Sequence, residues 1–194
     1  MLNENDRKES GKKESGRKPR GIRIAVSGKS GCGNTTVSRL VAEKLDLRFI
    51  NFTFRNLAEE KGLSLAEVLK LAAEDDSWDR EVDSRQVAIA REKGGCVLGS
   101  RLAIWMLPEA DLKVYLRARP ETRTARIVKR EGGGFESVAA FTAERDRQDR
   151  ERYLRIYNID NDLYNFADLV IDTDKINADQ IAQLIIDEAG KKAP

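Results

Sequence analysis

One stretch near the N-terminus has the residue types and spacing of a loop that holds phosphate groups. Between a strand-like segment, GIRIAVSG, and a helix-like segment, TTVSRLVAEKL, the chain reads GKSGCGNTT. A glycine-rich turn that opens a helix directs several backbone N–H groups and the positive end of the helix dipole toward one point, which suits a nucleotide phosphate. The residues predicted to bind it are Gly28, Lys29, Ser30, Gly31, Cys32, Gly33, Asn34, Thr35 and Thr36.

The loop departs at one position from the pattern G-x-x-x-x-G-K-[ST]. Gly28 and Gly33 have the required spacing, but Asn34 stands where the pattern has lysine. Thr35 falls where a hydroxyl ligates Mg²⁺ in such loops. The alternative is a purely structural turn, and the strand before and helix after favour the nucleotide loop. The missing positive charge then has to come from Lys29 or from arginines elsewhere in the chain.

Several arginines are placed where they can reach such a loop, and a planar guanidinium grips phosphate oxygens in pairs. Arg101 follows the buried-strand pattern CVLGS, and Arg55 starts the helix after the second expected strand. Both are therefore expected at the carboxyl edge of a parallel sheet, where ligands bind. Arg126 and Arg130 share one helix face just before glycines 132–134, which we interpret as the hinge of a moving flap.

A second arginine-rich stretch, RDRQDRER, follows these glycines. Arg145, Asp149 and Arg152 stand at positions i, i+4 and i+7, which is one face of a helix. The same pattern is typical of a solvated helix covered with salt bridges. The residues alone leave both interpretations open.

The elements that would position these residues alternate between strand and helix, which predicts an α/β fold with a parallel sheet covered on both faces. Strands are expected within residues 21–28, 47–52, 94–100, 110–118 and 166–173. Helices are expected over residues 35–45, over 54–93 with breaks near Gly62 and Ser77, and over 177–191. Asn177 is the expected cap of the last helix and Gly190 its expected stop.

Composition narrows the class of protein. The chain has 194 residues, 35% charged, with a formal net charge of +2, so no overall field favours nucleic acid or a membrane. It has no histidine, which excludes Ser-His-Asp catalysis and imidazole metal sites. Two cysteines and no apolar run of membrane-spanning length favour a cytoplasmic protein. Residues 1–20 are polar and predict a disordered, solvated tail, with nucleic-acid contact as the less favoured alternative.

Taken together, these residues resemble the cytidylate kinases of the short type found in archaea and some bacteria. The loop resembles the lysine-poor loops of that type, SRLAIWM resembles its GRLAGWM segment, and RDRQDRER resembles an R-D-x-x-D-x-x-R signature. The likeness runs from about Gly21 to Thr173. It implies a three-layer P-loop NTPase fold in one domain, residues 21–194, with a five-stranded parallel sheet. A helical nucleoside-monophosphate-binding region is expected at about 52–94, and an arginine-rich lid at about 130–148.

The resemblance also implies an activity: transfer of the γ-phosphoryl group of ATP to CMP or dCMP with Mg²⁺, in pyrimidine nucleotide metabolism. Its catalytic residues would be Arg101, Arg130, Arg145 and Arg152. Arg101 and Arg152 match arginines that hold the acceptor phosphate, with Arg145 beside them. Lid closure would bring Arg130 and Arg145 onto the transferring group.

The remaining roles implied by the resemblance concern nucleosides. Asp149 matches a carboxylate that contacts the acceptor's sugar, and Arg55 an arginine that also reaches its phosphate. Arg126, with Arg130, resembles a lid-entry pair that contacts ATP's adenine and phosphates. Arg80 matches a cytosine-reading arginine, and Asp83 lies near it in the sequence as a further expected substrate-binding residue. Small-molecule nucleotides are thus the expected partners of a monomeric enzyme.

The chain departs from the family pattern in two places that bear on its site. Leu102 follows Arg101 where the longer bacterial enzymes have an acidic, base-reading residue. The strand ending at Gly99 and Ser100 lacks the carboxylate that holds magnesium's waters in adenylate kinases. The alternatives are an adenylate- or uridylate-directed kinase, and a nucleotide-binding regulator without turnover.

Overall fold

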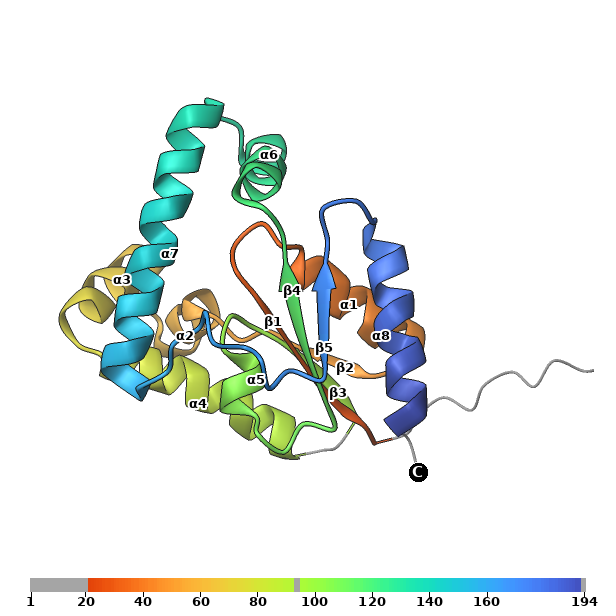
Figure 1. Cartoon of the computed structure of the whole chain (residues 1–194). Coiled ribbons are helices and arrows are strands. Elements are labelled where there is room, and N and C mark those ends of the chain that lie inside the picture. Colours follow the sequence, from red (N-terminus) through yellow and green to blue (C-terminus); the bar gives the residue numbers. More distant parts are fainter. Residues whose placement is uncertain (1–20, 93–94, 193–194) are drawn as a thin grey trace, which may run out of the picture.

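A parallel sheet lies at the centre of the computed structural model, which describes residues 21–92 and 95–192 (Figure 1). The five strands run in the order β2-β3-β1-β4-β5, and every neighbouring pair is parallel. Their bounds are β1 Arg23–Gly28, β2 Arg48–Ile50, β3 Cys96–Gly99, β4 Leu112–Arg117 and β5 Leu169–Asp172. The predicted five-stranded parallel sheet is confirmed. The expected N-terminal tail lies outside the described residues.

Helices cover both faces of this sheet (Figure 1). Side chains from α1 and α8 pack with Ile24 and Val26 of β1 on one face, and side chains from α4 and α5 pack with Ala25 on the other. This alternation along β1 produces the three layers. The helices are α1 Asn34–Leu45, α2 Phe54–Lys61, α3 Leu65–Glu74, α4 Ser77–Glu92, α5 Ala103–Met106, α6 Pro120–Glu131, α7 Phe135–Tyr157 and α8 Ala178–Lys192.

The last helix begins as predicted but does not end as predicted. Asn177 Oδ1 accepts a hydrogen bond from the Gln180 backbone N–H at 2.9 Å, which confirms the cap. The expectation that Gly190 stops the helix was wrong, since α8 continues to Lys192. Ala189 is fully buried against the sheet, and this packing stabilises the last turn more than the low helix propensity of glycine destabilises it.

Glycines connect the two helices that lie beyond the end of β4. Gly132 and Gly133 have φ angles of +81° and +96°, a left-handed conformation that glycine adopts without the strain of a side chain. The chain turns there from α6 into the long helix α7, which packs against α6 (Figure 1). The C-terminal part of α7 contacts α4 through Arg152–Asp79 and Tyr157–Asp83. That residues 130–148 move as a lid stays a prediction.

Candidate functional site

A cleft of about 560 Å³ lies at the carboxyl edge of the sheet. Its walls come from the loop after β1, the end of β3, the segment before α2, one side of α4, and parts of α6 and α7. Most of the predicted site residues meet here although they are far apart in sequence. They are Gly28, Lys29, Ser30, Gly31, Gly33, Asn34, Thr35, Thr36, Asp83, Arg101, Arg130, Arg145 and Arg152.

The loop after β1 has the backbone of an anion-binding turn. Gly31 and Gly33 have φ angles of +84° and +92°. Gly33 is the N-cap of α1 and has no side-chain cap within the described part of the chain. The first N–H groups of α1 are therefore left for a ligand, at the positive end of the helix dipole. Thr35 and Thr36, in that first turn, are exposed to the cleft.

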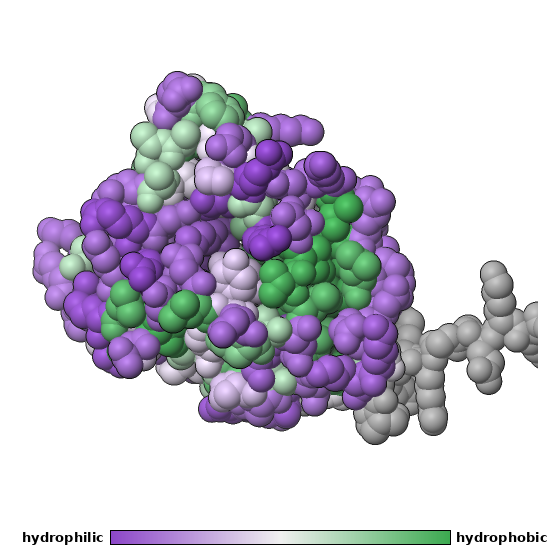
Figure 2. Space-filling model, viewed as in Figure 1, coloured by the Kyte–Doolittle hydropathy of each residue, from purple (hydrophilic) through white to green (hydrophobic). Residues whose placement is uncertain are grey.

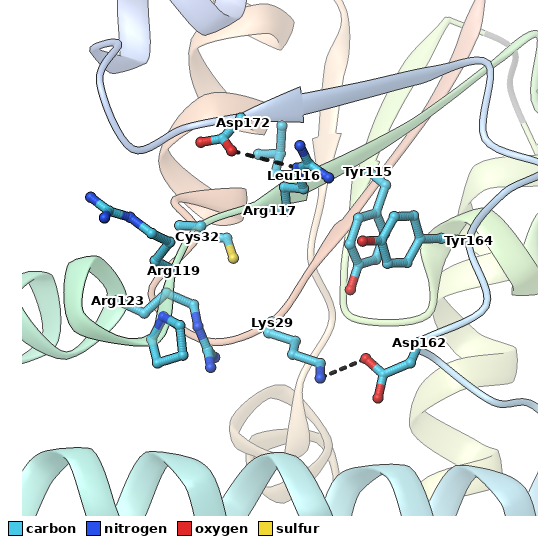
Figure 3. A pocket seen from close by; sticks show the side chains of 12 residues that line it. Lys29, Cys32, Tyr115, Leu116, Arg117, Arg119, Arg123, Asp162, Tyr164 and Asp172 are labelled. Carbon is cyan, nitrogen blue, oxygen red and sulfur yellow. Dashed lines mark ion pairs between the residues drawn. The ribbon is translucent and has the colours of Figure 1, made fainter.

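Neither Asn34, which stands at the lysine position, nor Lys29, proposed as one source of the missing charge, directs a free positive charge at this turn. The Asn34 side chain donates to the Ser100 carbonyl oxygen at 3.0 Å and accepts from Ser38 Oγ, so it ties α1 to the end of β3. Lys29 Nζ forms an ion pair with Asp162 Oδ1 at 2.6 Å (Figure 3). Positive charge at the cleft is therefore supplied chiefly by arginine.

A buried carboxylate organises these arginines. Asp149 on α7 is 6% exposed. Its Oδ2 pairs with Arg101 Nη1 at 2.8 Å, and its Oδ1 accepts from Arg152 Nη2 at 2.9 Å. Arg101 also donates to Ser30 Oγ at 2.7 Å, which connects it directly to the glycine loop. Asp149 thus holds two guanidinium groups beside the loop, where their mutual repulsion would otherwise separate them.

Arg145 adds a further positive charge, which forms no ion pair within the described part of the chain. It lines the cleft and forms no hydrogen bond or ion pair with the residues that the structure describes. Desolvation, followed by the neighbouring Arg101 guanidinium, lowers the pKa of Arg145 from its ordinary value. Arg130 lines the same cleft but pairs with Glu131 at 2.5 Å. A cleft with an unpaired guanidinium beside a second one has the electrostatics of a phosphate site.

Cys32 is buried and lines a second cavity rather than the cleft. Four more predicted residues do not line the cleft. Arg55 is exposed on α2, and the guanidinium of Arg80 lies 5.6 Å from the centre of the Tyr157 ring. Arg126 donates to Thr173 Oγ1 at 2.9 Å and to the Gly31 carbonyl at 3.3 Å, so it lies on the side of the loop that faces the end of β5. Asp149 is the fourth, and it lies behind the arginines that it pairs.

Sequence reasoning missed a buried arginine beneath the loop. Arg123 on α6 is 6% exposed, donates to the Ser30 carbonyl at 3.1 Å, and donates to Asp146 Oδ2 on α7 at 2.6 Å. Its position one helical turn before Arg126 was the available signal. Asp79 and Gln86, on the same face of α4 as Asp83, also line the cleft and were not predicted.

Asp83 lies in surroundings that disfavour its charged form. Burial raises the pKa of Asp83 to about 6, and a hydrogen bond from the Tyr157 hydroxyl at 2.7 Å opposes this rise in part. The nearby Asp79 carboxylate adds to the rise, whereas Arg152 and the Gln86 side chain oppose it. Between about pH 4 and pH 6 the folded state therefore holds a proton that the unfolded chain has released.

The raised pKa of Asp83 predicts that the free energy of unfolding depends on pH. Because the folded pKa is the higher one, the contribution of Asp83 to stability is greatest below pH 4 and is lost as the pH rises to about 6. Asp83→Asn should then gain on the order of 2 kcal/mol over the wild type at pH 8 and little at pH 4. Urea unfolding at the two pH values measures this difference, with Asp187→Asn, an exposed change on α8, as control. An equal effect of Asp83→Asn at both pH values would contradict the prediction.

A second cavity of about 380 Å³ lies on the other side of the loop, beside β4 and β5, near an apolar part of the surface (Figures 2 and 3). Lys29 and Cys32 face it from the loop, and Tyr115 and Tyr164 stack with ring centres 3.7 Å apart. Each basic side chain around it has a carboxylate partner in the described part of the chain. The pairs are Lys29–Asp162, Arg117–Asp172, Arg119–Asp174 and Arg123–Asp146. We therefore assign the phosphate chemistry to the larger cleft.

Comparisons with known proteins show which family this sequence is similar to. The model of the cytidylate kinase-like family matches residues 23–175. The chain is 47% identical over 175 residues to cytidylate kinase 2 of Borreliella afzelii, covering 88% of this chain and 98% of the relative. It is 42% identical over 164 residues to the cytidylate kinase of Pyrococcus horikoshii, covering 84% and 85%.

Solved structures support the fold. A shikimate kinase from Acinetobacter baumannii in complex with shikimate aligns with a TM-score of 0.59 at 20% identity, over 88% of this chain and 94% of the other. The deoxyadenosine kinase of M. mycoides with bound dATP aligns with a TM-score of 0.54 at 18% identity, over 87% and 99%. These likenesses show the P-loop kinase fold alone.

Of the helices that the structure describes, none has the length and apolar character needed to cross a bilayer.

Proposed function

This chain belongs to the cytidylate kinase-like family, and we propose that it transfers the γ-phosphoryl group of ATP to CMP, with dCMP as a second acceptor. The observation that carries the proposal is the single cleft in which the glycine loop faces Arg101, Arg145 and Arg152. Two anionic substrates need such a cleft, with amides for the donor and guanidinium groups for the acceptor.

The donor side is formed by backbone. The uncapped N–H groups of α1 and the loop amides bind the β- and γ-phosphates of ATP, and Arg126, between Gly31 and Thr173, lies where it can contact the adenine side of the nucleotide. Arg123 donates to the Ser30 carbonyl and so holds the loop against α6. This preorganisation lowers the cost of binding phosphate in the reactive geometry.

The acceptor side is formed by the arginines of β3 and α7. Arg101 and Arg152, oriented by Asp149, hold the phosphate of CMP. Arg145, which has no counter-ion among the described residues, stabilises the negative charge of the transferring group. The acceptor oxygen of CMP is already anionic, so no general base is required. Closure of residues 130–148 would bring Arg130 in and exclude water, which competes as an acceptor.

Mg²⁺ is part of this proposal, and the donor chemistry fits it. Thr35 presents a hydroxyl in the first turn of α1, next to the phosphate positions. The described residues contain no cluster of three or more His, Cys, Asp or Glu side chains able to hold a metal. This suits Mg²⁺, which keeps several waters and is bound largely through nucleotide phosphates. When bound, the ion would neutralise phosphate charge.

Two alternative functions are not favoured. An adenylate- or uridylate-directed kinase shares the phosphate clamps, but the curated relatives described above are named as cytidylate kinases. A nucleotide-binding regulator without turnover would not need Arg101, Arg145 and Arg152 gathered opposite the loop. Both cysteines are buried and free, which supports the proposal of a reducing, cytoplasmic location.

The experiment that tests the function is a survey of acceptors. ADP formation from ATP is measured with CMP, dCMP, UMP and AMP at matched concentrations. We expect the highest kcat/KM with CMP. A higher value with UMP or AMP, or ATP binding without any ADP formation, would refute the proposal.

The Thr35 hydroxyl is tested by its removal. Thr35→Ala should raise the Mg²⁺ concentration needed for half-maximal rate by about tenfold, because one direct or water-mediated contact to the ion is lost. Thr36→Ala, at the adjacent exposed position of α1, is the matched control and should change this requirement less. An unchanged Mg²⁺ dependence in Thr35→Ala would remove that residue from the metal site.

A further inference from the structure

One face of α4 presents buried oxygen atoms to the cleft. Asp79, Asp83 and Gln86 lie at positions i, i+4 and i+7, and all three line the cleft. Asp79 is 6% exposed and Gln86 is 4% exposed. Oδ2 of Asp79 and Oε1 of Gln86 are buried and accept no hydrogen bond from the described residues. Buried acceptors without a donor are costly, so two on one wall indicate a ligand that donates.

The neighbours of these two atoms determine which way they face. Gln86 Nε2 donates to Asp83 Oδ1 at 3.2 Å, and Asp83 Oδ2 accepts from the Tyr157 hydroxyl at 2.7 Å. The amide nitrogen of Gln86 is therefore occupied, and its oxygen is the free end. Burial raises the pKa of Asp79, and the Arg152 guanidinium, whose Nε lies 3.4 Å from the other carboxylate oxygen, opposes this rise. In its ionised form the carboxylate is an acceptor only.

The surroundings of this acceptor pair suit a flat ring. Val82 and Leu102 are 7% and 2% exposed, and both line the cleft with Phe52 and Phe54. The Leu102 side chain is apolar and cannot bind a base by hydrogen bonds. A contact that distinguishes bases has to come from another wall. Among the described residues that line the cleft, the buried acceptor atoms without a hydrogen-bond partner lie on α4, and the buried donor without one is Arg152 Nε on α7.

We propose that Asp79 and Gln86 accept hydrogen bonds from the exocyclic amino group of cytosine and thereby set the preference for CMP over UMP, a role that rests on the proposed function. Cytosine presents an amino donor at C4, where uracil presents a carbonyl acceptor. Uracil would place an oxygen against the Asp79 carboxylate and the Gln86 carbonyl, leaving all three without a donor. Adenine also carries an amino group, so the pair separates CMP from UMP, and AMP has to be rejected by the size of the cleft.

In this arrangement Asp83 is a positioning residue. It touches Gln86 and Tyr157, and through the Gln86 amide it keeps Oε1 directed at the base. Asp79 connects the base end of the cleft with the phosphate end, because the same carboxylate contacts Arg152. The Asp79 side chain then couples recognition of the base to the orientation of Arg152, which holds the CMP phosphate.

The test compares CMP with UMP in two variants. Gln86→Met keeps the length of the side chain and removes its acceptor, and Asp79→Asn replaces a carboxylate oxygen by an amide that can donate to the uracil oxygen. We expect the ratio of kcat/KM for CMP to that for UMP to fall by about 10- to 100-fold in each. In Gln86→Met the loss should fall on CMP, and in Asp79→Asn the value for UMP should rise relative to CMP. Arg85→Ala, an exposed change on α4 outside the cleft, is the control and should leave the ratio unchanged.

The outcome that overturns the proposal is a ratio that stays at the wild-type value in both variants while both rates fall together, since that is the result of a merely structural role. Calorimetric binding of CMP and UMP, without ATP, repeats the comparison independently of turnover. If the wild type formed no diphosphate but bound CMP more tightly than UMP, and the variants lost this difference, the proposed function would fail and the assignment of Asp79 and Gln86 would stand. Equal binding of CMP and UMP by the wild type would overturn the assignment itself.

Discussion

Arg101→Ala is expected to lower kcat/KM for CMP by about 10²- to 10³-fold, the loss seen when a preorganised donor to a developing charge is removed. The guanidinium links the two halves of the site, because it donates to Ser30 Oγ at 2.7 Å and pairs with Asp149 Oδ2 at 2.8 Å. Its removal takes a positive charge from the acceptor phosphate and leaves Asp149 with Arg152 as its remaining ion-pair partner in the described structure. The second effect should displace Arg152 as well.

Steady-state kinetics with varied CMP measure this loss. Two further variants show whether it is due to the Arg101 guanidinium itself. Arg101→Lys keeps the charge but not the planar fork and should recover part of the rate. Arg147→Ala removes an exposed arginine of α7 that pairs only with Glu144 and Glu151 among the described residues, so its rate should stay near the wild type. Wild-type kcat/KM in Arg101→Ala, or an equal loss in Arg147→Ala, would exclude Arg101 from the acceptor site.

Gly31→Ala is expected to abolish productive ATP binding, with a fall of at least about 10²-fold in kcat/KM for ATP. Two costs coincide at this position. The φ angle of Gly31 is +84°, a conformation that costs an alanine roughly 1–2 kcal/mol. An added Cβ would also lie 2.8 Å from the Cβ and the carbonyl oxygen of Arg123, so the loop or α6 has to shift. Either shift moves the amides away from the phosphates.

Gly62→Ala is a control that carries the conformational cost of a positive φ angle without the steric clash. Gly62 ends α2 with a φ angle of +67°, and a Cβ there would meet no atom within 4 Å. This control should lose about 1 kcal/mol of unfolding free energy and keep its affinity for ATP. Calorimetric titration of each variant with ATP, together with urea unfolding, gives both quantities. Wild-type ATP affinity in Gly31→Ala would mean that the loop does not bind the donor phosphates.

The locally encoded features were predictable from the sequence. Glycine spacing in GKSGCGNTT, the apolar strands, and the Asn177 cap each depend on residues within a few positions of one another. The helix periodicity that places Arg145, Asp149 and Arg152 on one face is also local, and α7 confirms it as a helix. The prediction from local propensity that α8 ends at Gly190 was wrong, because buried Ala189 packs the last turn of the helix against the sheet.

The sequence by itself determined the α/β fold and the loop at the start of α1. It identified the arginines that reach the cleft, Arg101, Arg130, Arg145 and Arg152, but also predicted Arg55, Arg80 and Arg126, which do not line it. Only the tertiary structure decided which charges are free. The strand order β2-β3-β1-β4-β5 brings Lys29, one candidate source of the missing charge, to Asp162, and Asn34, at the lysine position, to Ser100. Periodicity along one helix cannot show such pairings, since they depend on which segments meet across the sheet. For the same reason the unpartnered oxygens of Asp79 and Gln86 could be recognised only once the cleft was formed.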